Sequence, residues 1–178
     1  MYCGCNEKAL GSQRAIACSL LRLMEEEPYA DISISALCLE AGVSRPTFYS
    51  LFGSKDDVVA YILRESHCFV PERETQPRCT ELAALCRGYS RYITGQRHFL
   101  SLLVDNGISY LLYESILQAL LECGGFLAGE DAAARRHAAN FTAGALTGVA
   151  RDYVAREACT EEELSALLET LFSGAIFL

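Results

Sequence analysis

Residues 33–55, SISALCLEAGVSRPTFYSLFGSK, carry the signals for two short helices joined by a tight turn. Ser33 is a candidate N-cap of the first helix, because a serine hydroxyl accepts a hydrogen bond from an orphan backbone N–H one turn further on. Gly42 is expected to end that helix in the left-handed conformation. Ser44 is expected to cap the second helix, whose first turn tolerates Pro46. Two short helices joined in this way predict a helix-turn-helix unit.

The second helix of such a unit enters the major groove of DNA, while the first helix crosses the backbone. Side chains that face outward from the second helix can donate to phosphates or reach base edges. The alternative is a simple corner between two helices of a helical core, and the spacing alone leaves both interpretations open. The outward positions are Arg45, Thr47, Tyr49 and Ser50.

The stretch ALCLEAGVSRPTFYSLFGSKDDVV resembles the DNA-binding segment of the tetracycline-repressor (TetR/AcrR-like) family of transcriptional regulators. The resemblance extends over residues 13–62. It implies that Arg45 and Thr47 face the groove, and that Tyr49 and Lys55 bind phosphate. It also implies that serines at the start of the first helix touch the DNA backbone. The DNA-binding set expected from the motif and the resemblance comprises Ser33, Ser35, Ser44, Arg45, Thr47, Tyr49 and Lys55.

Length and composition set limits on the rest of the molecule. The 178 residues are enough for one domain, or for a small head fused to a larger body, and 51% of them are hydrophobic. A helical chain this apolar is expected to bury part of its surface in a partner. No apolar run approaches the roughly 18 residues that span a bilayer, and the first residues lack a secretion signal pattern. A cytoplasmic protein is therefore expected.

The charge balance argues against nonspecific binding of nucleic acid. The chain carries a net charge of −8, and residues 1–66 hold six Lys or Arg against nine Asp or Glu, which gives −3. Related regulators often have a basic N-terminal arm, whereas this chain offers only Lys8. Few phosphate contacts per subunit are expected, and hence reliance on a dimer and marked salt sensitivity. The alternative is a helical small-molecule-binding protein whose head no longer reads DNA.

The pattern predicts an all-α chain with an N-terminal three-helix helix-turn-helix head and a C-terminal helical body for ligand binding and dimerisation. The head covers residues 1–66, ordered from about residue 12, and its first helix is expected over 12–27. The body covers residues 67–178, after a linker at 70–78 that holds two prolines. The helices expected in the body span 80–94, 96–104, 108–123, 131–157 and 160–176.

The last two of these helices are predicted to pair with a second copy of the chain. Small residues recur along the first helix of the pair and allow close helix approach, while the final helix is more apolar than a surface helix should be. Two helices from each subunit would then form a four-helix bundle, as the family resemblance also implies. The alternative is packing inside one subunit only. The expected interface is Phe141, Ala145, Gly148, Asp152, Leu164, Leu168, Leu171 and Phe172.

No catalytic pattern is present, so no enzyme activity, cofactor or metal is expected. The three histidines lie far apart in the sequence, and the nine cysteines are interpreted mainly as small buried thiols. The resemblance implies that a small effector binds in the body and releases the DNA, which would make the protein a dimeric repressor of a palindromic operator. Each aromatic residue of the body, taken singly, also fits a core position. The candidate pocket is Tyr89, Tyr92, Phe99, Tyr110, Tyr113 and Phe141.

Overall fold

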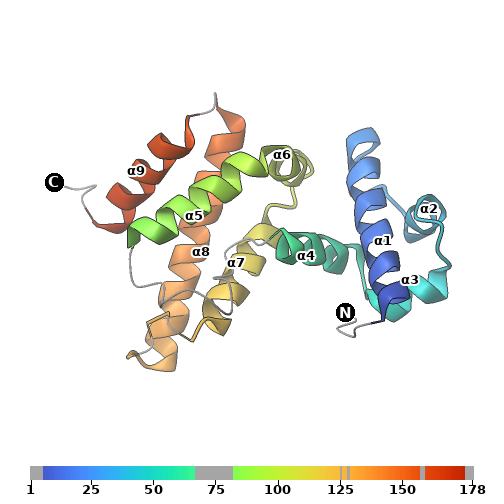
Figure 1. Cartoon of the computed structure of the whole chain (residues 1–178), viewed down its shortest axis with the longest axis horizontal. Helices are drawn as coiled ribbons and strands as arrows, with labels where there is room; N and C mark the ends of the chain where they lie inside the picture. The colour runs from blue at the N-terminus through green and yellow to red at the C-terminus, as the bar shows by residue number, and fades with distance from the viewer. Residues whose placement is uncertain (1–5, 67–81, 125, 128, 157–158, 175–178) are drawn as a thin grey trace.

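The computed structural model describes residues 6–66, 82–124, 126–127, 129–156 and 159–174, and these residues form helices without any strand (Figure 1). This confirms the all-α prediction. We call α1–α4 the head and α5–α9 the body. The helices are α1 (Glu7–Glu26), α2 (Ile34–Glu40), α3 (Arg45–Leu51), α4 (Lys55–Glu65), α5 (Leu82–Gly95), α6 (Arg97–Asp105), α7 (Tyr110–Glu122), α8 (Ala132–Ala155) and α9 (Glu161–Phe172).

The first helix begins earlier than the sequence pattern suggests. The side chain of Asn6 caps α1 by accepting a hydrogen bond from the backbone N–H of Lys8 at 3.0 Å. The expected start near residue 12 is therefore wrong, because Asn6 caps the helix in a stretch with little apolar periodicity. The helix ends at Glu26, shortly before Pro28, as expected.

The head is built around the apolar side of α1, against which α2, α3 and α4 pack. Ile16 and Leu20 of α1 are completely buried, together with Phe48 of α3 and Val58 of α4. The ring of Phe48 lies 6.0 Å from that of Phe52, which follows α3. This core fixes which side of α3 faces inward, and so which side is left for a partner.

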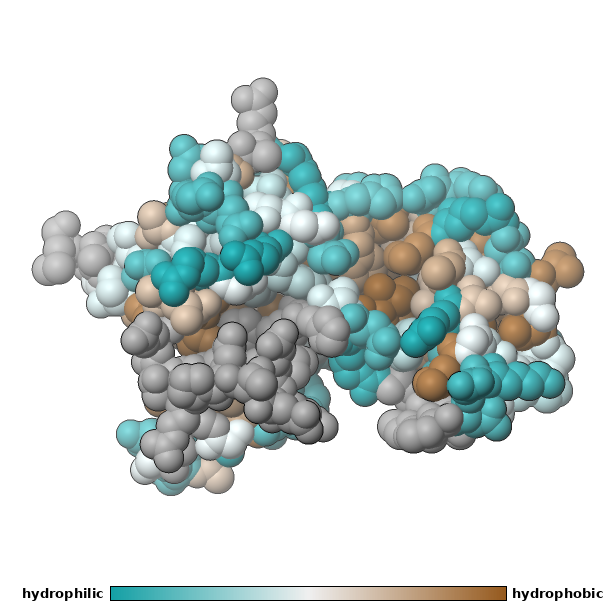
Figure 2. Space-filling model, viewed as in Figure 1, coloured by the Kyte–Doolittle hydropathy of each residue, from teal (hydrophilic) through white to brown (hydrophobic). Residues whose placement is uncertain are grey.

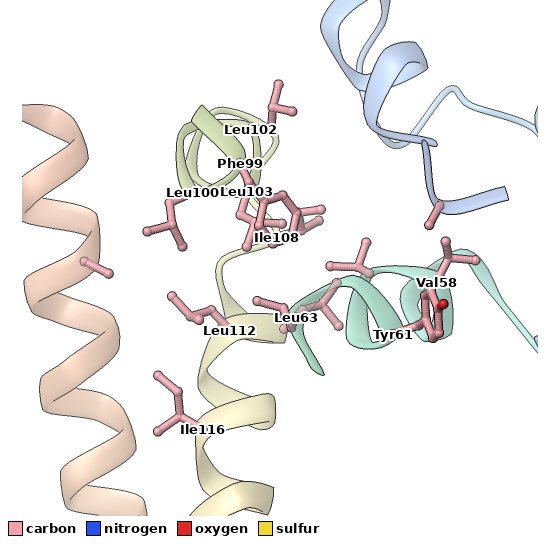
Figure 3. Packing of buried hydrophobic residues seen from close by; sticks show 14 of the residues in the cluster. Val58, Tyr61, Leu63, Phe99, Leu100, Leu102, Leu103, Ile108, Leu112 and Ile116 are labelled. Atoms are coloured by element: carbon pink, nitrogen blue, oxygen red, sulfur yellow. The ribbon is translucent and has the colours of Figure 1, made fainter. Parts of the chain in front are cut away.

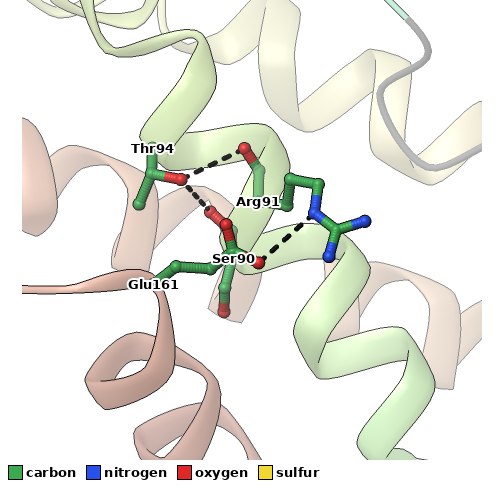
Figure 4. Close-up of polar contacts among 4 residues, drawn as sticks. All are labelled: Ser90, Arg91, Thr94 and Glu161. Carbon is green, nitrogen blue, oxygen red and sulfur yellow. Dashed lines mark hydrogen bonds and ion pairs between the residues drawn. The ribbon is translucent and has the colours of Figure 1, made fainter.

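The body pairs α5 with α9, while α6 and α7 pack against the long α8 (Figure 1). Its core includes the buried Tyr89 of α5, whose hydroxyl donates to the carbonyl of Leu146 in α8 at 2.8 Å. The side chain of Arg91 in α5 donates to Glu161 at the start of α9 at 3.3 Å (Figure 4). Helix α9 ends at Phe172, whereas the prediction extends to residue 176. Residues 175 and 176 lie outside the described part of the chain.

Head and body share one continuous apolar core. Helix α4 packs on α7, and α1 touches α6. Figure 3 shows Leu63 of α4 beside Leu112 of α7 and Ile108, which lies just before α7, and all three are buried. In the space-filling view, apolar side chains gather in the hollow between body and head (Figure 2). The expected linker at 70–78 lies outside the described residues. Within the described part, head and body meet where α4 packs on α7 and α1 on α6.

No helix in the described part of the chain is both long enough and apolar enough to cross a membrane.

Candidate nucleic-acid interface

Helix α3 presents one apolar side to the head and one polar side to solvent. Ser44 caps it, with its hydroxyl accepting from the backbone N–H of Thr47 at 3.2 Å, and a proline occupies its first turn. Phe48 and Leu51 point inward, 0% and 4% exposed. Arg45 and Tyr49 are exposed on the opposite side. The cap, the proline and the inward pair therefore orient the outward side chains.

The short hydroxyls of α3 already have partners within the helix. The hydroxyl oxygens of Ser44 and Thr47 lie 2.8 Å apart, and that of Ser50 donates to the carbonyl of Thr47 at 2.7 Å. Tyr49 is 50% exposed, with its ring edge-on to Phe48 at a centroid distance of 5.4 Å. The long side chains of Arg45 and Tyr49 are therefore the groups best placed to reach a ligand from this surface.

Helix α2 approaches α3 through the turn at Gly42. Gly42 has a φ of +64°, and the backbone N–H of Val43 donates to the carbonyl of Cys38 at 3.0 Å. Ser33 caps α2 by accepting from the backbone N–H of Ala36 at 3.0 Å. The prediction for Gly42 and the two serine caps, Ser33 and Ser44, is confirmed. Ser33 and Ser35 are both exposed at the start of α2.

The sequence analysis did not identify an exposed leucine of α2. Leu39 is 84% exposed, although its neighbour Cys38 is buried. Helical spacing alone would have indicated it, since Leu37 and Cys38 already occupy the inward side of this short helix.

The ammonium of Lys55 has partners within the head. Its ammonium donates to the carbonyls of Tyr29 and Ile32, at 2.6 Å each, and lies 4.5 Å from the centroid of the Tyr29 ring. Burial lowers the pKa of Lys55 from its ordinary value, and the neighbouring carboxylates of Asp56, Asp31 and Glu27 oppose that shift. The ammonium therefore faces the turn between α1 and α2, and the expected phosphate contact of Lys55 stays a prediction.

Asp56, next along α4, joins the head to the body. Its two carboxylate oxygens accept from the hydroxyl of Tyr29 at 2.6 Å and from that of Tyr110 at 2.9 Å. Burial, followed by the hydrogen bond to Asp56, raises the pKa of Tyr29 far above its ordinary value, and the same carboxylate raises that of Tyr110. Both phenols therefore stay protonated and donate. The sequence reasoning missed this cluster because its members are 27 and 54 residues apart.

The residues expected to line an effector pocket do not meet in one place. Tyr89, Tyr92 and Phe99 are buried, and the rings of the first two stack at 6.2 Å. Tyr110 lies at the junction with the head, and the hydroxyl of Tyr113 donates to Asn140 of α8 at 2.5 Å. The sixth residue, Phe141, is 74% exposed on α8.

Helices α8 and α9 border an apolar groove of about 620 Å³. Phe141 and Leu167, 74% and 48% exposed, stand on its two sides. Seven of the eight expected interface residues line it. Leu168 does not, because the packing of α9 on α5 buries it completely within the subunit. The groove is lined by Phe141, Ala145, Gly148, Val149, Asp152, Tyr153, Arg156, Cys159, Leu164, Leu167, Leu171 and Phe172.

Residues 19–62 match the family model described as bacterial regulatory proteins of the tetR family. The HTH-type transcriptional regulator EthR of Mycobacterium tuberculosis is 47% identical over 49 residues, which are 28% of this chain and 23% of EthR. EthR of Mycolicibacterium smegmatis is 41% identical over 51 residues, 29% of this chain and 24% of that relative. The sequence match to these curated relatives thus spans about a quarter of their length.

Solved structures share the fold over nearly the whole chain. Lin0861 from Listeria innocua has a TM-score of 0.76 at 16% identity and covers 98% of this chain and 96% of its own. A TetR transcriptional regulator from Streptococcus agalactiae gives 0.63 at 16% identity, covering 92% and 94%. The dihydroxyacetone kinase operon activator DhaS gives 0.56 at 17% identity, covering 93% and 96%. Similarity therefore extends from the head, where sequence and fold agree, to the body, where only the fold does.

Proposed function

Because this chain belongs, through its N-terminal domain, to the tetR family of bacterial regulatory proteins, we propose that it is a sequence-specific DNA-binding transcriptional regulator. In this proposal the protein is a cytoplasmic, dimeric repressor. It binds DNA without catalysing a reaction, and a small-molecule effector releases it from the DNA. The observation that carries it is the outward side of α3, where Arg45 and Tyr49 are exposed on a helix capped by Ser44. A guanidinium and a phenol at these positions can read base edges and hold phosphates.

The proposed dimer uses the groove between α8 and α9. Phe141 and Leu167 expose apolar surface there, and Ala145 and Gly148 are small enough for a second helix to approach closely. A second copy related by a two-fold axis would cover the same groove on both subunits. The two heads would then face successive turns of the major groove, which implies a palindrome with half-sites about 34–36 Å apart.

The proposed effector would have to open the body. Tyr89, Tyr92 and Phe99 fill the space between the helices as core residues, so a small molecule would bind a conformation in which they move apart. Such a ligand lowers DNA affinity only by as much as it prefers that conformation. Thermal unfolding with a panel of small apolar compounds, with and without operator, tests this part separately.

Selection of bound DNA from a random pool, with the full chain at low salt, tests the main proposal. Wild type is expected to enrich a palindrome. Arg45→Ala is expected to relax base preference at one position of each half-site, a loss of about 1–3 kcal/mol per contact. Tyr49→Ala is expected to weaken all sequences alike, because a phosphate contact carries no sequence information.

Arg136→Ala is the matched control, since it removes an exposed arginine from α8, away from the head. Its enriched sequences and affinity are expected to equal those of wild type. Enrichment of no sequence by wild type would instead favour the alternative, a ligand-binding protein whose head does not read DNA. Wild-type behaviour of both head variants would show that α3 is not the DNA-binding surface.

A further inference from the structure

Tyr29, in the turn between α1 and α2, is held from both the head and the body. From the body, the side-chain oxygen of Asn106 accepts from its backbone N–H at 2.6 Å. From the head, Lys55 donates to its backbone carbonyl and Asp56 accepts from its hydroxyl, both at 2.6 Å. Tyr29 itself is only 6% exposed. Its backbone and side chain therefore both have directional partners.

On the body's side, the corner between α6 and α7 supplies two residues to this contact, Asn106 and Tyr110. Asn106 ends α6, and its amide nitrogen also donates to the carbonyl of Leu102 at 2.9 Å, which fixes the side chain. Tyr110 begins α7 and shares the carboxylate of Asp56 with Tyr29. The Asn106 contact reaches the turn that runs directly into Ser33, the cap of α2, whereas Tyr110 reaches this turn only through Asp56, which also holds the Tyr29 hydroxyl.

These polar contacts restrict the angle between head and body, whereas the apolar contact beneath them holds the two parts together. Burial of Leu63 against Leu112 holds head and body together, but apolar burial has no directional preference. Hydrogen bonds weaken steeply when their distance or angle changes. The apolar packing therefore supplies adhesion, whereas Asn106 and Tyr110 restrict the angle at which the head sits on the body.

We propose that Asn106 and Tyr110 are positioning residues that set the head's angle and thereby determine which half-site spacing the dimer accepts. The inference rests on the proposed function. In a two-fold dimer joined through α8 and α9, the distance between the two copies of α3 depends on that angle. One base pair changes the separation by about 3.4 Å, so a loosened junction would accept neighbouring spacings.

The DNA test measures the affinity of the full chain for the selected palindrome with its spacer changed by one or two base pairs. Wild type is expected to prefer one spacing by at least about tenfold, the scale of a hydrogen bond to a charged group. Tyr110→Phe, which removes only a hydroxyl from a side chain that is 46% exposed, is expected to reduce that preference to about threefold or less. Its affinity for an isolated half-site is expected to stay unchanged.

Tyr113→Phe is the matched control. It removes a hydroxyl from the same helix, but one that donates to Asn140 of α8 within the body. It is expected to keep the wild-type spacing preference. Equal spacing profiles for wild type and Tyr110→Phe, or the same relaxation in Tyr113→Phe, would overturn the proposal.

A measurement without DNA separates this inference from the proposed function. Hydrogen exchange of the segment 28–33 reports on the Tyr29 N–H, and exchange rises when its acceptor is lost. Asn106→Ala, which removes that acceptor, is expected to speed exchange there by about tenfold. Tyr110→Phe acts on Tyr29 only through Asp56 and is expected to speed it less, while Tyr113→Phe leaves it unchanged. If wild type selects no DNA, the proposed function fails and exchange still decides whether the corner holds the turn. Unchanged exchange in both variants would overturn the inference.

Discussion

Lys55 matches the family motif and also has partners of its own within the head. The family resemblance implies a phosphate contact, whereas its ammonium lies between two carbonyls and over the Tyr29 ring. Burial lowers its pKa, and the carboxylates of Asp56, Asp31 and Glu27 oppose that shift. We infer that Lys55 acts on DNA binding indirectly, by holding the turn that leads into α2.

The residue-scale prediction compares Lys55→Met with Arg45→Ala. Lys55→Met keeps much of the apolar stem and is expected to lower the free energy of unfolding by about 1–3 kcal/mol, because two hydrogen bonds from a charged group are lost. The salt dependence of DNA binding is expected to stay as in wild type. Arg45→Ala, by contrast, is expected to leave the free energy of unfolding near that of wild type and to weaken DNA binding, because the exposed guanidinium is proposed to contact base edges.

Urea unfolding and DNA affinity at several salt concentrations measure the two effects. If Lys55→Met instead reduced the salt dependence of DNA affinity and left stability unchanged, a direct contact between Lys55 and phosphate would be supported.

At the scale of the element, α2 and α3 depend on their ends. Each has only 7 residues, and an isolated helix that short is unstable in water. Their stability therefore comes from other sources: the serine caps, the turn at Gly42 and the burial of Leu37 and Phe48. The left-handed backbone of Gly42 sets where α2 stops and at what angle α3 begins.

Gly42→Ala is the element-scale prediction. A Cβ would meet no atom within 4 Å, so the cost comes from the φ of +64°. We expect the free energy of unfolding to fall by about 1–2 kcal/mol, the cost of the left-handed conformation for an L-residue. Thermal or urea unfolding measures it.

Gly88→Ala is the control, because Gly88 lies within α5 with equally open surroundings. It is expected to raise stability by about 0.5–1 kcal/mol, since alanine loses less backbone entropy on folding. A gain of stability in both variants would show that the turn at Gly42 tolerates a side chain without strain.

At the scale of the whole molecule, two surfaces at opposite ends have to act together. Helix α3 lies at the far end of the head, while α8 and α9 lie across the body (Figure 1). In the proposed dimer, the rigidity of α4 and of the junction at Asp56 links one surface to the other.

Leu167→Asp is the whole-molecule prediction. It places a charge on an apolar residue that is 48% exposed and lines the groove. In the proposed dimer the charge would be buried in both subunits, and we expect the dissociation constant to rise by at least about 100-fold. Light scattering after size exclusion measures the state, and the preference for a palindrome over a half-site is expected to disappear.

Leu39→Asp makes the same change on an exposed leucine of the head, 84% exposed and outside the groove. Its oligomeric state is expected to equal that of wild type. A dimer that persists in Leu167→Asp would place the interface elsewhere.

Local signals accounted for much of the head. The caps at Ser33 and Ser44 and the turn at Gly42 are confirmed. They could be predicted because each depends on residues only a few positions away. Thr160 caps α9 through equally local contacts, since its side chain and that of Glu163 bond reciprocally to backbone N–H groups. The start of α1 was misplaced because Asn6 caps it in a stretch with little apolar periodicity.

The sequence by itself determined an all-α chain, the positions of its turns and the outward residues of α3, because caps, glycines and apolar spacing act over one or two helical turns. Only the tertiary structure decided that Lys55 faces a turn, that Leu168 is internal and that Tyr29, Asp56, Asn106 and Tyr110 meet. Those contacts join residues up to 77 positions apart. Their partners are chosen by how α4 packs between head and body, and no local pattern encodes that choice.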